Sequence, residues 1–187
     1  MKDNSNLKGG NMGKLKLVFP NNDYKFQYLD FIEECKEDLE LNGFECCFPI
    51  STKETIDNDI ITLRNRRKGI NLLEGWVPDS VLWMFDEFNN EIVGSVSIRH
   101  RLTENLKFRG GHIAYYIKPS ERNKGYASKM LFLALKYCKE TLGINKVLIT
   151  CSKDNVYSAK TILNNGGMLY CEDMDNNEKI QRYYIYL

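Results

Sequence analysis

Apolar residues recur at two spacings along this chain, and the change from one spacing to the other separates helices from strands. Apolar side chains three and four residues apart predict helices at 24–41, 51–68, 128–142 and 156–164, with a short one at 103–108. Short apolar or alternating runs predict strands at 14–19, 81–85, 91–102, 112–118, 146–151, 168–171 and 179–187. The predicted chain therefore contains both helices and strands.

Turn residues and length set the expected domain organisation. Three predicted helices are followed by glycine, which readily ends a helix in the left-handed conformation. These helix ends are expected at Asn42-Gly43, Gly143 and Gly166-Gly167. The 187 residues suit one domain, and no internal repeat or linker is visible. Residues 1–13 are polar and rich in Gly and Asn, which predicts a disordered arm before a single domain at 14–187.

Charge and cysteine content narrow the class of protein. The net charge is +1, so neither nucleic acid nor a membrane surface is expected as a partner. No apolar run approaches the ~20 residues that a membrane helix needs, and no signal peptide is visible. The six cysteines are scattered without a C-x-x-C pair, which is typical of reduced thiols and predicts a cytoplasmic protein.

One stretch carries the candidate chemistry. An apolar and aromatic strand ends at Pro119, a basic turn containing Gly125 follows, and a helix begins near Ser128. A strand, a glycine-containing turn and a helix in this order direct backbone N–H groups toward an anion. Gly125 and the small Ala127 keep bulky side chains away from a diphosphate that must approach the backbone. We therefore expect a phosphate-binding turn at 122–127.

The same turn is part of a wider pattern. Arg122-Asn123-Lys124-Gly125-Tyr126-Ala127 fits R/Q-x-x-G-x-G/A, and a later buried strand is followed by Asn155-x-x-Ser158-Ala159 and a helix ending at Gly166-Gly167. In this combination the chain resembles the GNAT superfamily of acyl-CoA N-acyltransferases. The resemblance covers residues 80–187, and over 14–80 it rests on the order strand, helix, helix.

The resemblance implies a fold and a cofactor. The fold would be a GNAT-type α/β fold with a mostly antiparallel sheet of about six to seven strands and about four flanking helices. The sheet would splay between the strands at 112–118 and 146–151. Acetyl-CoA would lie in this V-shaped opening as co-substrate, and no metal would be needed.

The resemblance also implies which residues contact the cofactor. Backbone groups of Tyr116, Ile117 and Lys118 would pair with the pantetheine arm like an added strand. Asn155 would reach the pantetheine or the thioester, with Ser158 close by. The diphosphate would bind the amides of Arg122, Asn123, Lys124, Gly125, Tyr126, Ala127 and Ser128.

The chemistry in such proteins is direct attack of an amine on the thioester carbonyl. Many relatives place a Glu, as general base, where this chain has His112, whose ordinary pKa near ~6.5 suits a base at neutral pH. We therefore expect His112 to be the general base, directly or through water. The alternative is that His112 is a satisfied, half-buried strand residue.

For the acid that protonates the leaving thiolate, relatives often carry a Tyr where this chain has Ile162. The remaining candidates for this acid are Ser158, Tyr157 and three tyrosines of the last strand, and we favour Ser158. The alternative is that these side chains are packing residues. The three tyrosines of the last strand are Tyr183, Tyr184 and Tyr186.

The leading interpretation is an acetyl-CoA-dependent N-acetyltransferase that acts on a primary amine of a small molecule or peptide, as a monomer or homodimer. The alternative is a catalytically weak acyl-CoA-binding sensor or scaffold of the same fold. The basic run 64–68 is expected to be a solvated helix end rather than an anion contact. Arg99 and Arg101 are expected to form surface ion pairs, the alternative being recognition of an acidic acceptor.

Overall fold

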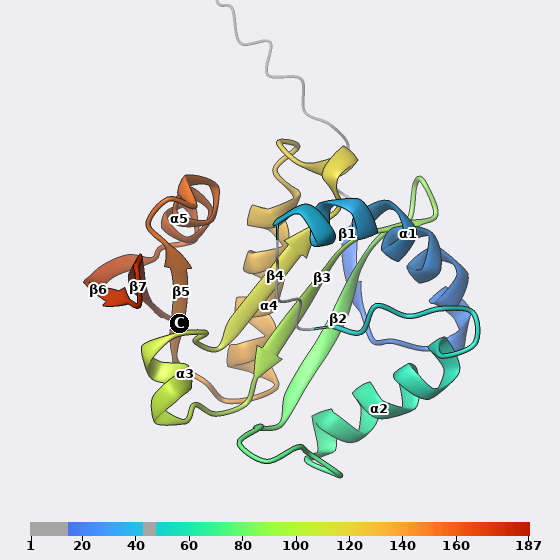
Figure 1. Ribbon diagram of the computed structural model, residues 1–187, viewed down its shortest axis with the longest axis horizontal. Helices are drawn as coiled ribbons and strands as arrows, with labels where there is room; N and C mark the ends of the chain where they lie inside the picture. Colours follow the sequence, from blue (N-terminus) through green and yellow to red (C-terminus); the bar gives the residue numbers. More distant parts are fainter. Residues whose placement is uncertain (1–14, 43–47) are drawn as a thin grey trace, which may run out of the picture.

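The computed structural model describes residues 15–42 and 48–187 (Figure 1). The predicted arm at 1–13 and two of the six cysteines, Cys46 and Cys47, lie outside the described residues. The elements are β1 (Leu15–Val18), α1 (Lys25–Asn42), α2 (Ile56–Lys68), β2 (Asp79–Asp86), β3 (Glu91–Arg99), α3 (Glu104–Phe108), β4 (Ile113–Ile117), α4 (Tyr126–Glu140), β5 (Lys146–Ser152), α5 (Val156–Asn164), β6 (Met168–Asp175) and β7 (Glu178–Tyr186), with 3-10 turns at Asn22–Tyr24 and Pro119–Glu121.

Local capping chemistry explains several helix ends. Thr103 accepts a hydrogen bond from the N–H of Leu106 at the start of α3, and Asn155 accepts one from the N–H of Ser158 at the start of α5. Gly69 ends α2 in the left-handed conformation. The predicted start of α2 near residue 51 is wrong, because Thr52 and Glu54 bond to one another in a turn and the helix begins at Ile56.

The strands form two sheets, in the orders β1-β2-β3-β4 and β5-β7-β6, and all their ladders are antiparallel. Between the sheets, the described residues contain a single bridge, which joins Gly111 to Ile149. Figure 1 shows β4 and β5 diverging from this end. The predicted splay between the strands at 112–118 and 146–151 is therefore confirmed. Within the described residues there are five α-helices, of which α3 is the shortest.

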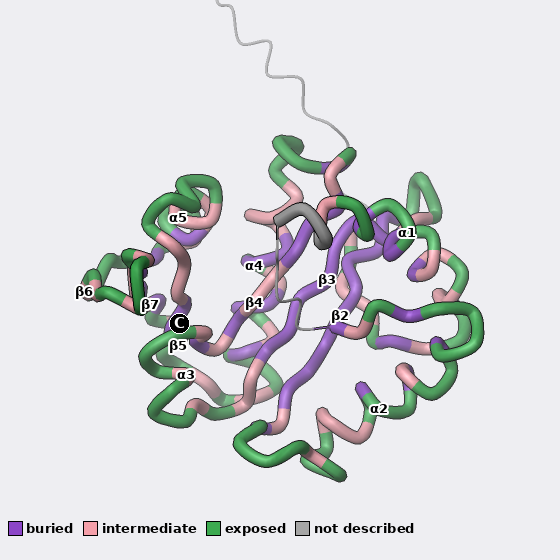
Figure 2. The backbone as a smooth tube through the Cα atoms, in the orientation of Figure 1, coloured by how far each residue is buried: buried purple, intermediate pink, exposed green. Residues whose placement is uncertain are grey.

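Both faces of the larger sheet are covered. One core contains side chains of α4 and of Val96, Ile98 and Ile113, and the other contains side chains of α1, α2 and Trp83. Figure 2 shows β2 and β3 buried over most of their length, since helices pack on each side of them. The sheet therefore forms a rigid frame, and its only open edge toward the second sheet is that of β4.

Candidate functional site

The two sheets are joined at His112, just before β4. The His112 N–H donates to the carbonyl of Leu148 at 2.7 Å, and the Leu148 N–H donates to the Nδ1 of His112 at 3.0 Å. The N–H of Gly110 adds a bond to the Thr150 Oγ1 at 2.9 Å. Here the imidazole of His112 takes the place that a backbone carbonyl would take in a continuous sheet.

This geometry fixes the protonation state of His112. A backbone N–H is always a donor, so Nδ1 must be the accepting, unprotonated nitrogen and Nε2 carries the proton. Burial lowers the pKa of His112, and the nearby charge of Arg99 lowers it further. A neutral His112 in this tautomer has its one lone pair bound to Leu148. The geometry thus favours the half-buried structural residue that was the alternative to the general base.

The free edge of β4 faces the opening. Alternate residues along this strand form hydrogen bonds with β3. At one end the Lys118 N–H donates to the Val93 carbonyl at 3.1 Å, and at the other end the His112 carbonyl accepts a bond. The same alternation directs the N–H and C=O groups of Tyr115 and Ile117 away from β3. Of the three residues expected to pair with a ligand, only Ile117 therefore points its backbone into the opening.

The turn after β4 has a backbone conformation that is common where proteins bind anions. Asn123 and Gly125 have φ angles of 62° and 83°, both in the left-handed region that reverses the direction of successive N–H groups. Gly125 is the N-cap of α4, and it has no side chain to cap the first turn of the helix. The first N–H groups of a 15-residue helix therefore remain uncapped by any side chain at the predicted diphosphate turn.

The side chain of Arg122 points away from this anion site. Its Nη1 and Nη2 lie 3.1 and 2.6 Å from the two carboxylate oxygens of Asp38 on α1, and its Nε donates to the Ile117 carbonyl at 3.2 Å. The Tyr116 hydroxyl donates to the same Asp38 at 2.5 Å. Arg122 therefore fastens the turn to α1, which the sequence pattern did not predict.

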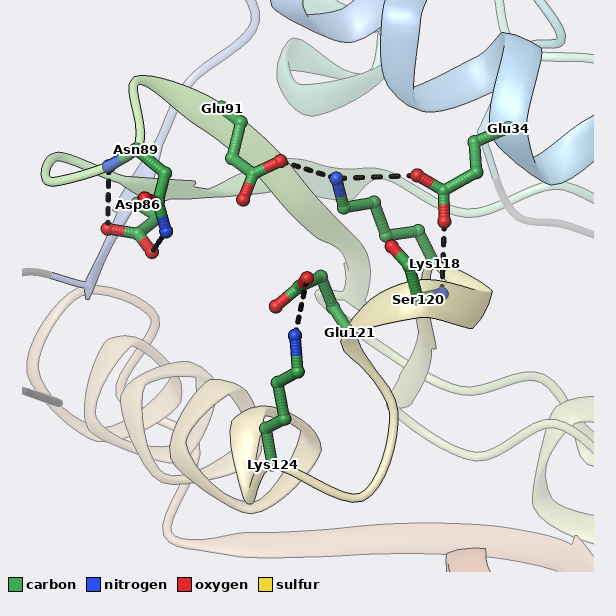
Figure 3. A network of polar contacts seen from close by, with 8 residues as sticks. All are labelled: Glu34, Asp86, Asn89, Glu91, Lys118, Ser120, Glu121 and Lys124. Atoms are coloured by element: carbon green, nitrogen blue, oxygen red, sulfur yellow. Dashed lines mark hydrogen bonds and ion pairs between the residues drawn. The ribbon is translucent and has the colours of Figure 1, made fainter. Parts of the chain in front are cut away.

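Other cations of this stretch are also paired with carboxylates, as Figure 3 shows. Lys118 lies 2.5 Å from Glu91 and 3.4 Å from Glu34, whose other oxygen accepts the Ser120 N–H at 3.0 Å. Lys124 lies 2.7 Å from Glu121. The positive potential of the site therefore comes chiefly from backbone N–H groups and the helix dipole.

A cluster of hydroxyl groups lies between β4 and α5. The Tyr115 hydroxyl is 2.9 Å from the Oγ of Ser158, and the Ser158 N–H donates to the Asn155 Oδ1 at 3.0 Å. Burial raises the pKa of Tyr115 to about 12. The structure thus brings together the predicted Asn155 and Ser158 and adds Tyr115, which the sequence reasoning missed although strand alternation places it on the same face as Ile113 and Ile117.

The other candidate tyrosines have other partners, and Ile162 occupies the position where relatives often carry the acid. Ile162 is fully buried in the core, and the Tyr183 hydroxyl donates to Gln181 at 2.7 Å. Tyr157 is 73% exposed. Tyr184 and Tyr186 contact the ammonium group of Lys146, which lies 3.8 and 5.3 Å from their rings. Ser158 is the predicted candidate whose hydroxyl forms a hydrogen bond with a side chain of β4, that of Tyr115.

Two basic groups differ from expectation. Arg66, in the run at 64–68, forms two bonds of 2.9 and 2.5 Å to Asp79, whose side chain is 4% exposed, so it is not a solvated helix end. Arg99 donates to the carbonyls of Gly110 and Gly111 at 3.3 and 3.0 Å, which are contacts that the sequence did not predict. Arg99 therefore supports the junction at His112.

In the described ranges, no cluster of three or more His, Cys, Asp or Glu side chains is arranged to bind a metal ion. No helix within those ranges combines the length and apolar character needed to cross a bilayer.

Comparison with protein families decides the identity of the fold. Residues 50–168 match the family model described as Acetyltransferase (GNAT) domain, which is more than half of the chain. The chain belongs to the GNAT acetyltransferase family. The resemblance found in the turn at 122–127 and the helix at Asn155 is thereby confirmed, and the protein is an acyltransferase by family. A comparison with curated proteins gives no match.

Solved structures agree on the GNAT fold. The microcin C7 self immunity acetyltransferase MccE, in complex with acetyl-CoA and AMP, has 17% identity and a TM-score of 0.65 over 93% of both chains. A ribosomal-protein-S5-alanine acetyltransferase from Vibrio fischeri has 14% identity and a TM-score of 0.69, covering 92% of this chain and 91% of that one. RimL, a ribosomal-protein acetyltransferase in complex with coenzyme A, has 16% identity and a TM-score of 0.66 over 93% and 94%.

Proposed function

We propose that this GNAT protein transfers an acetyl group from acetyl-CoA to a primary amine of a small molecule or peptide, by direct attack. The uncapped start of α4, next to the opening between β4 and β5, carries the proposal. Backbone N–H groups at a helix start suit a diphosphate, and an open strand edge suits the amides of a pantetheine arm. The MccE and RimL structures contain acetyl-CoA and coenzyme A, which supports the same ligand here.

Within this proposal, each part of the site has one task. The amides from Arg122 to Ser128 bind the diphosphate, and the backbone of Ile117 pairs with the pantetheine arm. Asn155 and Ser158 lie by the thioester. The acceptor amine attacks the thioester carbonyl, and its proton leaves to a base other than His112, whose Nδ1 is bound to Leu148.

The second candidate function is an acyl-CoA-binding sensor or scaffold with weak catalysis. Two observations favour it. Ile162, at the position where relatives often carry a tyrosine acid, is fully buried. The lone pair of His112 is occupied at the junction of the sheets. Both differences from the relatives fall at positions expected to act in catalysis, and neither changes the proposed cofactor contacts.

Two measurements on the purified full chain separate these functions. Thermal unfolding with coenzyme A alone reports binding, since a ligand that binds only the folded state raises the melting temperature. Release of free thiol from acetyl-CoA, over a panel of small amines and peptides with free N-termini, reports transfer. We expect stabilisation and thiol release with at least one amine. Stabilisation without release would favour the sensor, and absence of both would reject the two functions.

The acceptor and the cellular location are also inferred. RimL and the Vibrio fischeri enzyme are described as acetyltransferases of ribosomal proteins, which keeps a peptide amine among the candidate acceptors. Free thiols at Cys35, Cys138, Cys151 and Cys171 fit a cytoplasmic protein, because thiols are kept reduced there. We further infer one catalytic domain at 14–187 that acts as a monomer or homodimer, without nucleic acid or membrane.

Replacing Arg122 with glutamine is expected to weaken coenzyme A binding about 5- to 10-fold, which is about 1–1.4 kcal/mol. The change removes the two-pronged ion pair with Asp38, so the diphosphate turn is no longer fastened to α1. The Arg122 side chain is 42% exposed, so a modest effect on global stability is expected. Isothermal titration calorimetry with coenzyme A measures the change.

The matched control for this prediction is Lys107→Gln. Lys107 forms an exposed ion pair of 2.7 Å with Glu104 on α3, so its replacement removes the same charge without touching the turn. Binding within about two-fold of wild type is expected for this control. Equal affinities of the Arg122 and Lys107 variants would show that the bond to Asp38 does not support the turn.

A further inference from the structure

Tyr115 reaches from the central strand across the opening to α5. Its side chain lies on the face of β4 that Ile113 and Ile117 share, and it packs beside their core. Its hydroxyl meets the Ser158 Oγ at 2.9 Å. A tyrosine on one side of the opening is therefore bonded to a serine on the other, and no ladder joins the strands between them.

The level of Tyr115 along β4 matches the reactive end of the proposed cofactor. The anion turn follows the C-terminal end of β4, so a pantetheine arm bound there runs back along the strand. Ile117 is the first residue whose backbone faces the opening and Tyr115 is the second, about 7 Å further at ~3.3 Å per residue. The arm has two amide groups, and its sulfur follows the second by two methylene groups. The sulfur therefore falls near Tyr115.

The Tyr115 hydroxyl remains protonated throughout the physiological range. Burial is the largest influence on its pKa, which is about 12, and the bond to Ser158 opposes part of that effect. The pKa of an ordinary thiol is near ~8.5, so a thiolate does not remove the proton from such a phenol. Tyr115 can therefore donate a hydrogen bond to a thiolate without transferring the proton to it.

We infer that Tyr115 is a catalytic residue, whose hydroxyl donates a hydrogen bond to the sulfur that leaves as the coenzyme A thiolate. The inference rests on the proposed function and names a further residue for it. In the reaction, the amine nitrogen forms a bond to the thioester carbon, and the carbon–sulfur bond breaks with its electron pair going to sulfur. The proton lost by the amine passes to solvent. The Ser158 hydroxyl supports the Tyr115 oxygen as a donor.

This assignment fits the rest of the site. Ile162 is fully buried, so α5 offers no hydroxyl at the place where relatives often have one. A hydroxyl from β4 reaches α5 one turn earlier, at Ser158, which is held by the Asn155 cap. Cys151 on β5 lies beside the pair, and burial raises the pKa of its thiol, so it adds no negative charge at neutral pH. The leaving sulfur would thus meet a donor and no competing anion.

The first test needs no acceptor amine. The thiol of coenzyme A bound to the full chain is titrated by ultraviolet absorbance of its thiolate, with the unliganded protein titrated in parallel to subtract its own thiols. Losing one hydrogen bond to the thiolate should raise the bound thiol pKa by about one unit in Tyr115→Phe. Tyr170→Phe, a 66% exposed tyrosine on β6, is the control and should match wild type.

The second test is kinetic. Tyr115→Phe should lower kcat about ten-fold and leave the KM for acetyl-CoA within about two-fold, because the bond strengthens as charge forms on sulfur. Ser158→Ala keeps the phenol and weakens it as a donor, so a loss of about three-fold is expected. This variant keeps the test decisive if Tyr115→Phe does not fold.

The outcomes separate the role of Tyr115 from the proposed function of the protein. A bound thiol pKa and a kcat that are the same in wild type and in the Tyr115 variant would overturn the role of Tyr115, while the proposed function would stand. If the Tyr115 variant does not fold, an unchanged kcat and an unchanged bound thiol pKa in Ser158→Ala would overturn the role of Tyr115. Wild-type protein that binds no coenzyme A would overturn the proposed function and the inference with it.

Discussion

Gly111→Ala is expected to lower the free energy of unfolding by about 3 kcal/mol or more, the largest effect of any change proposed for this chain. Two costs combine. Gly111 has a φ of +63°, where a side chain adds about 1–2 kcal/mol, and a Cβ would lie 2.4 Å from the Leu148 carbonyl oxygen. That contact is with backbone of the opposite sheet, so neither partner can rotate away. Urea denaturation of the full chain measures the loss.

Gly143→Ala is a matched control for this prediction. Gly143 has nearly the same φ, +66°, but a Cβ there would meet no atom within 4 Å. Its variant therefore measures the cost of the left-handed backbone alone, about 1–2 kcal/mol. The difference between the two variants is the contact at the junction of the sheets. Equal losses in both would mean that the junction can relax, and that the approach of Gly111 to Leu148 is not a constraint on the opening.

His112→Ala is expected to cost about 1–3 kcal/mol of unfolding free energy, since the Leu148 N–H at the junction would lose its acceptor. His112→Asn is expected to retain most of the stability, because the asparagine carbonyl can accept the same N–H. Neither variant has an imidazole. Comparing them therefore separates an imidazole needed as hydrogen-bond acceptor from one needed as base.

Activity gives the deciding readout for His112. If the role is structural, turnover of the asparagine variant should stay within about three-fold of wild type with the same pH profile. A general base is worth about 10²–10⁴ in rate, so a loss of that size in both variants would restore the original interpretation. The alanine variant alone would not decide, since its site is expected to be disturbed by the broken junction.

Stability against pH gives an independent check. Burial lowers the pKa of His112 below its ordinary value of 6.5, so between the two values the unfolded chain binds more protons than the folded one. Stability is therefore fully present above about pH 6.5 and falls as the pH drops below it. His100 adds a dependence of the same sign, because burial lowers its pKa too. His112→Asn should flatten the fall, and an unchanged slope would place the dependence elsewhere.

The strands, the helices and the turn at 122–127 follow from local sequence. Thr103 and Asn155 cap the helices that the apolar pattern predicted, because a cap depends only on residues within one turn. Gly125 precedes α4 and adopts a left-handed conformation, as a turn of that composition requires. The six-residue turn pattern and the Asn155 helix, taken together, also sufficed to predict the family.

Side-chain partners across elements did not follow in the same way. The backbone amide of Arg122 was expected to bind a diphosphate, but the sequence did not predict the partner of its side chain, which is Asp38, 84 residues away. Arg66 was expected in solvent, and it pairs with the buried Asp79 across the packing of α2 on β2. Each basic residue has several possible anionic partners along the chain, and only the packing of helices on the sheet decides which one is within reach.

His112 and Tyr115 show most clearly where the sequence stops and the tertiary structure begins. The sequence by itself determined the strand that carries Tyr115 and begins just after His112, the turn that follows it and the family, because these depend on periodicity, glycine and short spacings. It did not determine that His112 would bond to Leu148, 36 residues away, or Tyr115 to Ser158, 43 residues away. Those contacts depend on how two sheets meet, and a hydrogen bond forms only when the register of both brings donor and acceptor within about 3 Å.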